Sequence, residues 1–563
     1  MDEFDNISRA PQACSSCRKQ KRKCDKGLPA CSLCVRMSRT CDYSESTPPL
    51  SSDDFESLRQ KVQELESRLQ ATSPNGPLLT PPSSSNDSPA NLPFGGTAPK
   101  RGPRAFPPMY FLDASYFSYG RFPVPKASIP VPMEALDLLG GAPDVQLAVG
   151  TFFETVHKFF PIISKKRLVL HLANPLAESG ADLALLFLCM KLVSERPFVG
   201  PEGGEMPLYS VAKRFYFLAE TNNVTTLHLL QAGLLIALYE IGHGIYPAAF
   251  LTVGNCARLG YALGLRAEKG AAQMLNRCGT WTEQEERRRV WWGVVILDRY
   301  VALGAAHYPL VAEDPKLDEF LPMDDTAWDE GRMTVNEPLF VSSATDMPAG
   351  PFARLCQAAH LLGRVIRHTT DKIDDPEFRV QEALQLEKTI KALAGVLPGE
   401  CFEESRLCTA ISICYRYSAP FQSLVATSLT LRSALLTLYE NYSCYESLQS
   451  RTPQDLMLQK TSINGLEDIS KEVAWFSSQL SNILEYEPEV VSPFLSDCLY
   501  QAAANCAWKI RESGDKNATE LLETLQQTIS KLDQRWAIAG EYTKILSTTE
   551  RILVTGETPD FVD

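Results

Sequence analysis

The chain has 563 residues, of which 44% are hydrophobic and 22% are charged, with 38 prolines and 16 cysteines. This length suffices for roughly two to four domains, and the composition is that of a globular protein, which excludes a fibrous or wholly disordered chain. The formal net charge of −13 is uneven, because residues 14–41 carry eight basic side chains and one acid while the other residues sum to −20. A compact basic segment in an acidic chain indicates a polyanionic partner for that segment alone.

The first residues, MDEFDNISRAPQ, lack the basic stretch followed by an apolar one that a secretory signal requires. No stretch reaches the ~18 consecutive apolar residues of a membrane helix. The best candidate, residues 227–239, is interrupted by His228 and Gln231. We therefore expect a soluble protein inside the cell, with no membrane partner.

Six of the cysteines form two copies of one eleven-residue unit, C-x2-C-x6-C, written CSSCRKQKRKC and CSLCVRMSRTC. They are Cys14, Cys17, Cys24, Cys31, Cys34 and Cys41. Three thiolates cannot complete a tetrahedral zinc site, but six can serve two zinc ions if two sulfurs bridge both metals. So small a module has almost no apolar core, and its fold must come from metal. Three disulfides are the alternative, and they need an oxidising compartment that nothing in the N-terminal sequence indicates.

The cysteine spacing, the basic stretch between the second and third cysteines, and Pro29 two residues before the fourth resemble the fungal binuclear zinc cluster family of transcription factors. The resemblance implies a DNA-binding domain over residues 10–45 that holds two zinc ions, with a short helix after each C-x2-C. It also implies that Cys14 and Cys31 bridge the metals. One zinc would then be held by Cys14, Cys17, Cys24 and Cys31, and the other by Cys31, Cys34, Cys41 and Cys14.

Charge distinguishes the two halves of this module. Between its second and third cysteines the first half carries five cations among the six residues RKQKRK, whereas VRMSRT in the second half carries two. Affinity for DNA should therefore fall steeply with salt, with a slope of about −0.9 per phosphate neutralised. The first half is the candidate for the major groove. The alternative reading of RKQKRK is a solvated face or a nuclear-import signal.

The resemblance also assigns roles within the basic run. Lys21, four residues after Cys17, matches the family position that reads the base edges of CGG triplets, and a cation that donates to guanine O6 and N7 is the pairing that geometry favours. Phosphate contacts are assigned mainly to Arg18, Lys19, Arg22 and Lys23. The expected function is a nuclear, zinc-dependent, sequence-specific DNA-binding regulator of transcription that acts with the transcription machinery. Family members of this layout often control biosynthetic or metabolic gene clusters.

Residues 53–70 carry apolar side chains at alternating spacings of three and four, which is the pattern of a coiled coil. They are Phe55, Leu58, Val62, Leu65 and Leu69. In a parallel homodimer Asp54 would face Arg59, and Lys61 would face Glu66, so both pairs attract. We expect a short dimerisation segment here, although two heptads are fewer than the three or four of a firm assignment. The alternative is a single amphipathic helix packed on its own chain.

The remainder of the chain divides by composition. Residues 71–133 contain 14 of the 38 prolines and many Ser, Gly and Asn, so we expect a disordered linker. Residues 140–555 carry apolar side chains at helical spacing and predict an all-helical regulatory region. Within it, residues 140–420 resemble the fungal-specific transcription factor domain, for example in EERRRVWWGVVILDRYVALG at 285–304. The predicted fold is therefore mostly α, with a small metal-organised zinc cluster, a short coiled coil, a disordered linker and a large all-α domain.

No enzyme is expected, because the sequence lacks G-x-S-x-G, G-x-x-x-x-G-K-[ST], G-x-G-x-x-G and H-E-x-x-H motifs and its seven histidines lack metal-ligand spacing. Trp291, Trp292 and Asp298 occur at helical offsets and predict a packed structural face. Helical pockets also bind metabolites, so a small-molecule effector stays open. The competing function is a helical scaffold or ligand-sensing protein whose zinc module is a structural or protein-binding clip. The five cations of RKQKRK favour DNA.

Overall fold

The computed structural model describes residues 10, 12–19, 23–43, 108–113, 129–173, 180–195, 207–266, 274–275, 278–304, 308–333, 339–344, 346–371, 375–402, 419–444 and 453–555. The chain divides into two compact units, residues 1–98 and 99–563. The expected coiled coil, residues 53–70 with Phe55, Leu58, Val62, Leu65 and Leu69, lies outside the described residues. It therefore stays a prediction.

The described part of the first unit has two short helices, α1 (Ser15–Lys19) and α2 (Ser32–Arg36). The resemblance implied a short helix after each C-x2-C. Each helix instead begins within that motif, directly after the first cysteine of the repeat, and contains the second cysteine. Four buried cysteines make up the core of the unit, namely Cys14, Cys17, Cys31 and Cys34. A module whose core is sulfur cannot be held by apolar burial, because almost no apolar area leaves water when it folds.

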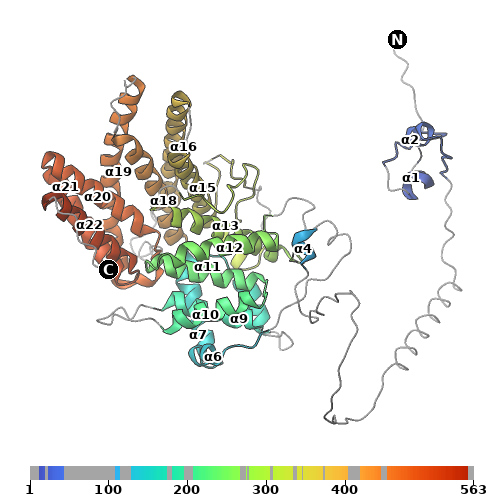
Figure 1. Ribbon diagram of the computed structural model, residues 1–563, viewed down its shortest axis with the longest axis horizontal. Coiled ribbons are helices and arrows are strands. Elements are labelled where there is room, and N and C mark those ends of the chain that lie inside the picture. The colour runs from blue at the N-terminus through green and yellow to red at the C-terminus, as the bar shows by residue number, and fades with distance from the viewer. Residues whose placement is uncertain are drawn as a thin grey trace, which may run out of the picture. The chain divides into compact units, whose positions relative to one another are not determined.

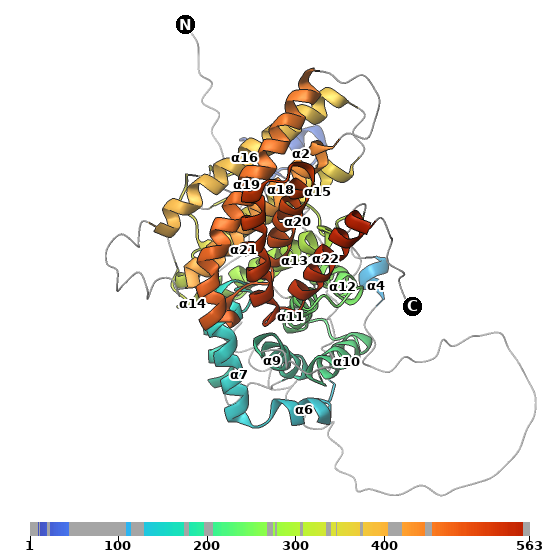
Figure 2. The same ribbon diagram turned by 90° about the vertical axis from the view of Figure 1, so that its left-hand side faces the viewer.

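The second unit is built from helices, seen from two sides in Figures 1 and 2. Its first half contains α4 (Met109–Leu112), α6 (Met133–Leu139), α7 (Ala142–Glu154), η1 (Val156–Lys158), α8 (Lys165–Ala173), α9 (Ala181–Ser194), α10 (Pro207–Thr221), α11 (Leu227–Gly242), α12 (Ala248–Leu263) and α13 (Trp281–Ala302). Its second half contains α14 (Asp325–Asp329), α15 (Pro351–Thr370), α16 (Pro376–Phe402), α18 (Ala419–Ser443), α19 (Pro453–Tyr486), η3 (Pro488–Val490), α20 (Leu495–Ser513), α21 (Lys516–Asp533) and α22 (Ile538–Thr555). Within the described residues of this unit, the only β-structure is one isolated bridge between Phe320 and Phe340. The expected mostly α fold is confirmed.

Helix α11 is the centre of the first half of this unit. Every residue from Leu229 to Gly242 is buried, because the sequence is apolar on all sides of the helix. The helix packs against α9, α10, α12 and α13, and Figure 1 shows it between α12 and the pair α9 and α10. The two polar side chains buried in it, Gln231 and Glu240, both find partners on neighbouring helices. None of the described helices is both long and apolar enough to cross a membrane.

The C-terminal helices complete the unit. Helices α19, α20 and α21 run side by side (Figure 2), and α18 packs against α15, α19 and α20. The indole of Trp536 is fully buried and donates to the carbonyl of Val491 at 2.7 Å. His243, which ends α11, lies between the rings of Tyr239 and Trp536, at 4.2 and 5.5 Å between centroids. Burial lowers the pKa of His243 to about 3, so the ring is neutral and has a structural role.

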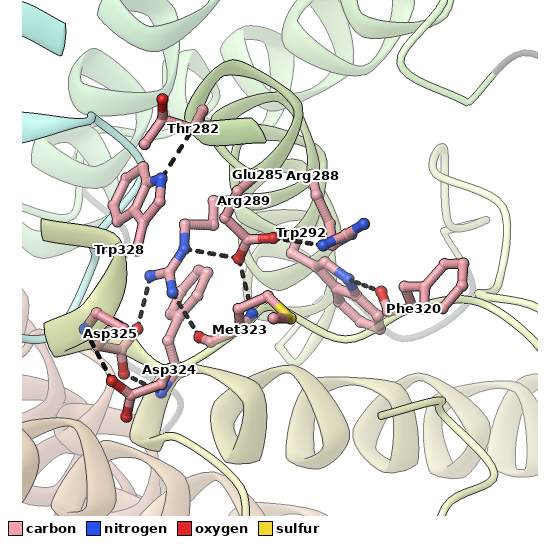
Figure 3. Close-up of polar contacts among 12 residues, drawn as sticks. Thr282, Glu285, Arg288, Arg289, Trp292, Phe320, Met323, Asp324, Asp325 and Trp328 are labelled. Carbon is pink, nitrogen blue, oxygen red and sulfur yellow. Dashed lines mark hydrogen bonds and ion pairs between the residues drawn. The ribbon is translucent and has the colours of Figure 1, made fainter. Parts of the chain in front are cut away.

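Arg289 of α13 is the centre of a buried network that joins α13 to α14 and α15 (Figure 3). Its guanidinium is fully buried and bonds to Glu285 Oε1 at 3.0 Å, to Asp325 Oδ1 at 2.6 Å and to the carbonyl of Met323 at 2.7 Å. The guanidinium also lies over the ring of Trp328, 4.2 Å from its centroid. A buried arginine is tolerated because each of its charged and polar groups has a partner.

The packed face predicted on α13 is confirmed. Trp291 and Trp292 are buried, and the indole of Trp292 donates to the carbonyl of Phe320 at 3.2 Å. Asp298 pairs with Arg299, whose Nη1 lies 2.7 Å from Asp298 Oδ2. Arg299 in turn reaches Asp314 Oδ1 at 2.7 Å. These aromatic and charged side chains are therefore used to hold helices and loops together.

The structure departs from the expected linker, residues 71–133, in its last part. Within that segment α4 is helical and Tyr110 is buried in the core of the second unit, where its hydroxyl donates to the carbonyl of Ala262 at 3.0 Å. Ile129 and Val131 also pack against this core. Composition averages over a window, and it hides single apolar residues that a preformed helical surface can bury.

Candidate metal centre and nucleic-acid interface

The two cysteine repeats build the same local structure twice. In each repeat the first cysteine precedes a helix, and its sulfur accepts the backbone N–H of the second cysteine. Cys17 N lies 3.5 Å from Cys14 Sγ, and Cys34 N lies 3.4 Å from Cys31 Sγ. The backbone N–H groups at a helix start have no intrahelical acceptor. They are therefore available to stabilise negative charge on the sulfur, which favours a thiolate over a thiol.

The six sulfurs form two overlapping groups of four. Cys14, Cys17, Cys24 and Cys31 make one group, and Cys14, Cys31, Cys34 and Cys41 make the other. Within each group all sulfurs lie within 4.8 Å of one another. Cys14 and Cys31 belong to both groups, and they occupy the same position in their respective repeats.

The distances between the sulfurs fit zinc and not disulfides. Cys14 Sγ lies 3.8 Å from Cys31 Sγ and 3.6 Å from Cys34 Sγ, and Cys17 Sγ lies 3.7 Å from Cys31 Sγ. A tetrahedron with Zn–S bonds of about 2.3 Å has edges of about 3.8 Å, whereas a disulfide requires about 2.05 Å. All six cysteines are free thiols. The donor set and its spacing therefore suit two tetrahedral zinc ions with shared ligands.

The electrostatics of the cluster call for positive charge. Burial raises the pKa of Cys14, but hydrogen bonds from the backbone and side chain of Cys17 outweigh it and lower that pKa to about 6. Burial and the same contact raise the pKa of Cys17 to about 12. Closely packed thiols cannot all ionise together, because the thiolates repel. Two divalent cations supply the counter-charge that six thiolates need.

Two side chains outside the cysteines complete the module, and neither was predicted from the sequence. The carboxylate of Asp25 accepts the backbone N–H of Ser32 at 3.1 Å and its hydroxyl at 2.6 Å, so it binds the start of α2. These hydrogen bonds lower the pKa of Asp25. Tyr43 donates to the carbonyl of Gly27 at 2.8 Å. The sequence did contain a signal for Asp25, because an aspartate follows the third cysteine in both repeats.

The corresponding contact in the other half uses the backbone. Ser15 N donates to the carbonyl of Asp42 at 2.8 Å. The first residue of each helix therefore donates a hydrogen bond to the residue that follows the last cysteine of the other repeat. This exchange ties the two halves together around the sulfurs and gives the module an approximate two-fold symmetry.

The candidate DNA-contacting residues are only partly within the described chain. The backbones of Arg18 and Lys19 form the end of α1, and Lys23 is exposed just before Cys24. Lys21 and Arg22 lie outside the described residues. The second half differs in chemistry, because α2 exposes Val35 in addition to Arg36.

Comparison with known families gives two matches. Residues 12–50 match the fungal Zn(2)-Cys(6) binuclear cluster domain, whose members bind two zinc ions. Residues 149–483 match the fungal specific transcription factor domain, which covers α8 to α18 and most of α19. The families are those of transcription factors and not of enzymes.

Curated relatives agree with these matches. Transcription factor BOA15 of Botryotinia fuckeliana is 40% identical over 180 residues, which is 32% of this chain and 98% of that protein. Transcription factor tazR of Aspergillus terreus is 27% identical over 285 residues, 49% of this chain and 44% of that protein. Pigment biosynthesis transcriptional activator pigB of Monascus ruber is 28% identical over 191 residues, 32% of this chain and 34% of that protein. The aligned part thus spans less than half of the second and third relatives.

Proposed function

Because the chain belongs to the fungal-specific transcription factor family and carries a Zn(2)-Cys(6) cluster domain, we propose that it is a nuclear, zinc-dependent regulator that reads CGG-type triplets in DNA. The observation that carries this proposal is the pair of overlapping four-sulfur groups, which share Cys14 and Cys31. In the sequence, the five cations of RKQKRK stand between two of these ligands, Cys17 and Cys24. A purely structural zinc clip has no use for such a run, whereas phosphate binding does.

Metal binding is assigned to the six cysteines. One zinc is held by Cys14, Cys17, Cys24 and Cys31, and the other by Cys14, Cys31, Cys34 and Cys41. Two zinc ions held there would cross-link the two repeats and offset most of the negative charge of the six thiolates. Asp25 and Tyr43 then keep the loop between the repeats in place through their bonds to Ser32 and Gly27. The result is a rigid module that can present a basic helix to a groove.

DNA binding is assigned to the first repeat. Lys21, four residues after Cys17, matches the position that reads bases in this family, and we assign to it the donation to guanine O6 and N7. Phosphate contacts are assigned to Arg18, Lys19, Arg22 and Lys23. The second repeat offers fewer cations and an exposed Val35, which suits a face turned away from a polyanion.

Two further features belong to the proposal. The heptads at residues 53–70 would pair two copies of the chain and set the spacing of two half-sites. One relative is named for the activation of pigment biosynthesis. By extension, the genes controlled here are those of a biosynthetic or metabolic cluster, reached together with the transcription machinery.

A binding assay on the full chain tests the assignment of roles. The probes are a duplex with CGG half-sites and a duplex of the same length with scrambled triplets. We expect Lys21→Ala to reduce the preference between the two duplexes, by about 1–3 kcal/mol of discrimination. Arg18→Ala should weaken binding to both duplexes alike and reduce the salt slope by about one.

The outcomes separate the proposal from its alternative. Equal losses on both duplexes for both variants would contradict the division between base reading and phosphate contact. If the zinc-loaded chain showed no salt-dependent affinity for either duplex, the cluster would be a structural or protein-binding clip. Binding that survives complete removal of zinc would contradict the zinc dependence.

A further inference from the structure

A small polar cavity lies among α8, α9, α11 and α13 of the second unit. Its volume is about 130 Å³, and its polar lining comes from Arg167, His171, His228, Gln231 and Glu286. It lies within the chain segment that matches the fungal-specific domain and involves none of the cysteines of the zinc module. No role in metal or DNA binding uses these residues.

Gln231 presents an unused acceptor to this cavity. Its side chain is fully buried, and its amide nitrogen donates to the carbonyl of Ile162 at 2.9 Å and to Glu286 Oε1 at 3.1 Å. Both of these partners are acceptors, so the amide orientation is determined. The amide oxygen has no hydrogen-bond donor among the residues that the structure describes. A buried acceptor without a donor is costly, and a bound molecule that donates a hydrogen bond would satisfy it.

The charges of the lining are already balanced. Glu286 accepts the backbone N–H of Ser164 at 2.9 Å and the amide of Gln231, and it forms an ion pair with Arg167. His228 Nδ1 lies 3.4 Å from Asp182 Oδ2. A cationic ligand would be repelled by Arg167, and an anionic ligand would be repelled by Glu286. The cavity therefore suits an uncharged molecule.

A second polar atom faces the same space. His171 Nε2 is buried and has no partner within the described ranges, and its ring lies 6.4 Å from that of His228 between centroids. An imidazole nitrogen either donates or accepts, depending on its tautomer. Hydroxyl groups do both, so a molecule with several hydroxyls matches His171 and Gln231 together. An ammonium group can only donate, so it matches His171 Nε2 in one tautomer alone.

Size and access set the remaining limits. A dry cavity of about 150 Å³ can hold benzene, so this one has room for about six non-hydrogen atoms. The side chains of Arg167 and His228 are 37% and 38% exposed, so the cavity opens to solvent between them. We propose that this cavity binds a small uncharged polyhydroxy molecule, with one hydroxyl donating to Gln231 Oε1 and another bonded to His171 Nε2. The proposal does not rest on DNA binding.

Saturation-transfer NMR on the full, zinc-loaded chain tests this directly. The probes are the small polyols glycerol and ethylene glycol at millimolar concentration, with glycolate and ethanolamine as anionic and cationic comparators. We expect transfer to the two polyols and none to the charged compounds. Binding of glycolate or ethanolamine instead of the polyols would overturn the argument from charge. Absence of transfer to either polyol would mean that the cavity holds water only, and the proposal would be wrong.

Variants locate the site. Gln231→Met keeps the length of the side chain and removes the amide oxygen, and we expect it to weaken polyol binding at least fivefold. Gln385→Met, at an exposed position of α16, is the matched control and should leave binding unchanged. His171→Phe removes the second unpaired polar atom, Nε2, and should also weaken polyol binding. Equal binding by all three variants would place the polyol elsewhere and overturn the assignment.

Circular dichroism and zinc content should be unchanged in all three variants. These controls separate loss of the cavity from loss of the fold. They also make a failure here distinct from a failure of the proposed DNA-binding function, because the zinc module and its DNA affinity are measured independently.

Discussion

Arg289→Met removes the guanidinium that Glu285 and Asp325 share inside the second unit (Figure 3). Methionine retains most of the apolar stem, so the change tests charge and hydrogen bonding more than volume. Breaking one side of a buried ion pair costs about 3–5 kcal/mol, because the remaining charge is left without compensation. Glu285 keeps its pair with Arg288 and the backbone N–H of Met323. We therefore expect the lower part of that range, about 3 kcal/mol.

The matched control is an exposed ion pair in the same region. Arg332 pairs with Glu330, and their side chains are 67% and 51% exposed. Surface pairs of this kind contribute about 0–1 kcal/mol, so Arg332→Met should be close to the wild type. Urea unfolding followed by tryptophan fluorescence measures both variants, because the buried ring of Trp328 lies against Arg289.

The pH dependence gives a second check on Arg289→Met. Burial raises the pKa of Asp325 in the folded state, and Arg289 opposes that shift. Without Arg289 the folded-state pKa of Asp325 rises further, so its ionised carboxylate destabilises the folded variant more than it destabilises the folded wild type. That penalty is complete well above the raised pKa of Asp325, decreases as pH falls through that pKa, and vanishes below the unfolded-state pKa. The free energy of unfolding of Arg289→Met should therefore approach that of the wild type as the pH is lowered from 7 into the acid range. A difference under 1 kcal/mol at pH 7, or one that widens in acid, would refute the reasoning.

Three other substitutions test close packing and the zinc module. In Gly242→Ala the new methyl would overlap the buried ring of Trp536, so we expect a loss of about 1–3 kcal/mol in the same urea assay. In Gly254→Ala, the matched control, the new methyl group would enter open space, so the free energy of unfolding should be unchanged or higher by up to about 1 kcal/mol. Equal changes in the free energy of unfolding for the two glycine variants would contradict this account. Asp25→Ala removes the acceptor of Ser32, and we expect faster zinc release to a chelator. An unchanged release rate would show that the bond to α2 is dispensable.

Much of the zinc module could be predicted from spacing alone. Two repeats with the same cysteine spacing can hold two zinc ions if two ligands are shared, and the family resemblance named Cys14 and Cys31 as those ligands. The structure brings both of them into both sulfur groups. The roles of Asp25 and Tyr43 were not foreseen, because each acts on the backbone of a distant loop residue. Such contacts depend on how the chain returns on itself, and cysteine counting carries no information about that path.

In the helical unit, periodicity indicated helices but not their partners. The apolar spacing of residues 227–242 predicted a helix, and the structure shows that this helix, α11, is also buried on all sides from Leu229 to Gly242. By contrast, Arg289 is the last of three consecutive arginines in a charged segment of the sequence, yet its side chain is fully buried. Its burial depends on Asp325 and Trp328, which follow some 36 and 39 residues later and approach only in the folded unit. Tyr110 was hidden for the same reason, because its site is created by α12.

The metal content of the full chain tests the central claim most directly. Elemental analysis combined with native mass spectrometry should find two zinc ions per chain, and complete chelation should abolish duplex binding. Cys31→Ser, which removes a shared ligand, should impair both metals, whereas Cys41→Ser should spare the one held by Cys14, Cys17, Cys24 and Cys31. A single zinc per wild-type chain, or duplex binding that persists in the metal-free chain, would contradict the account.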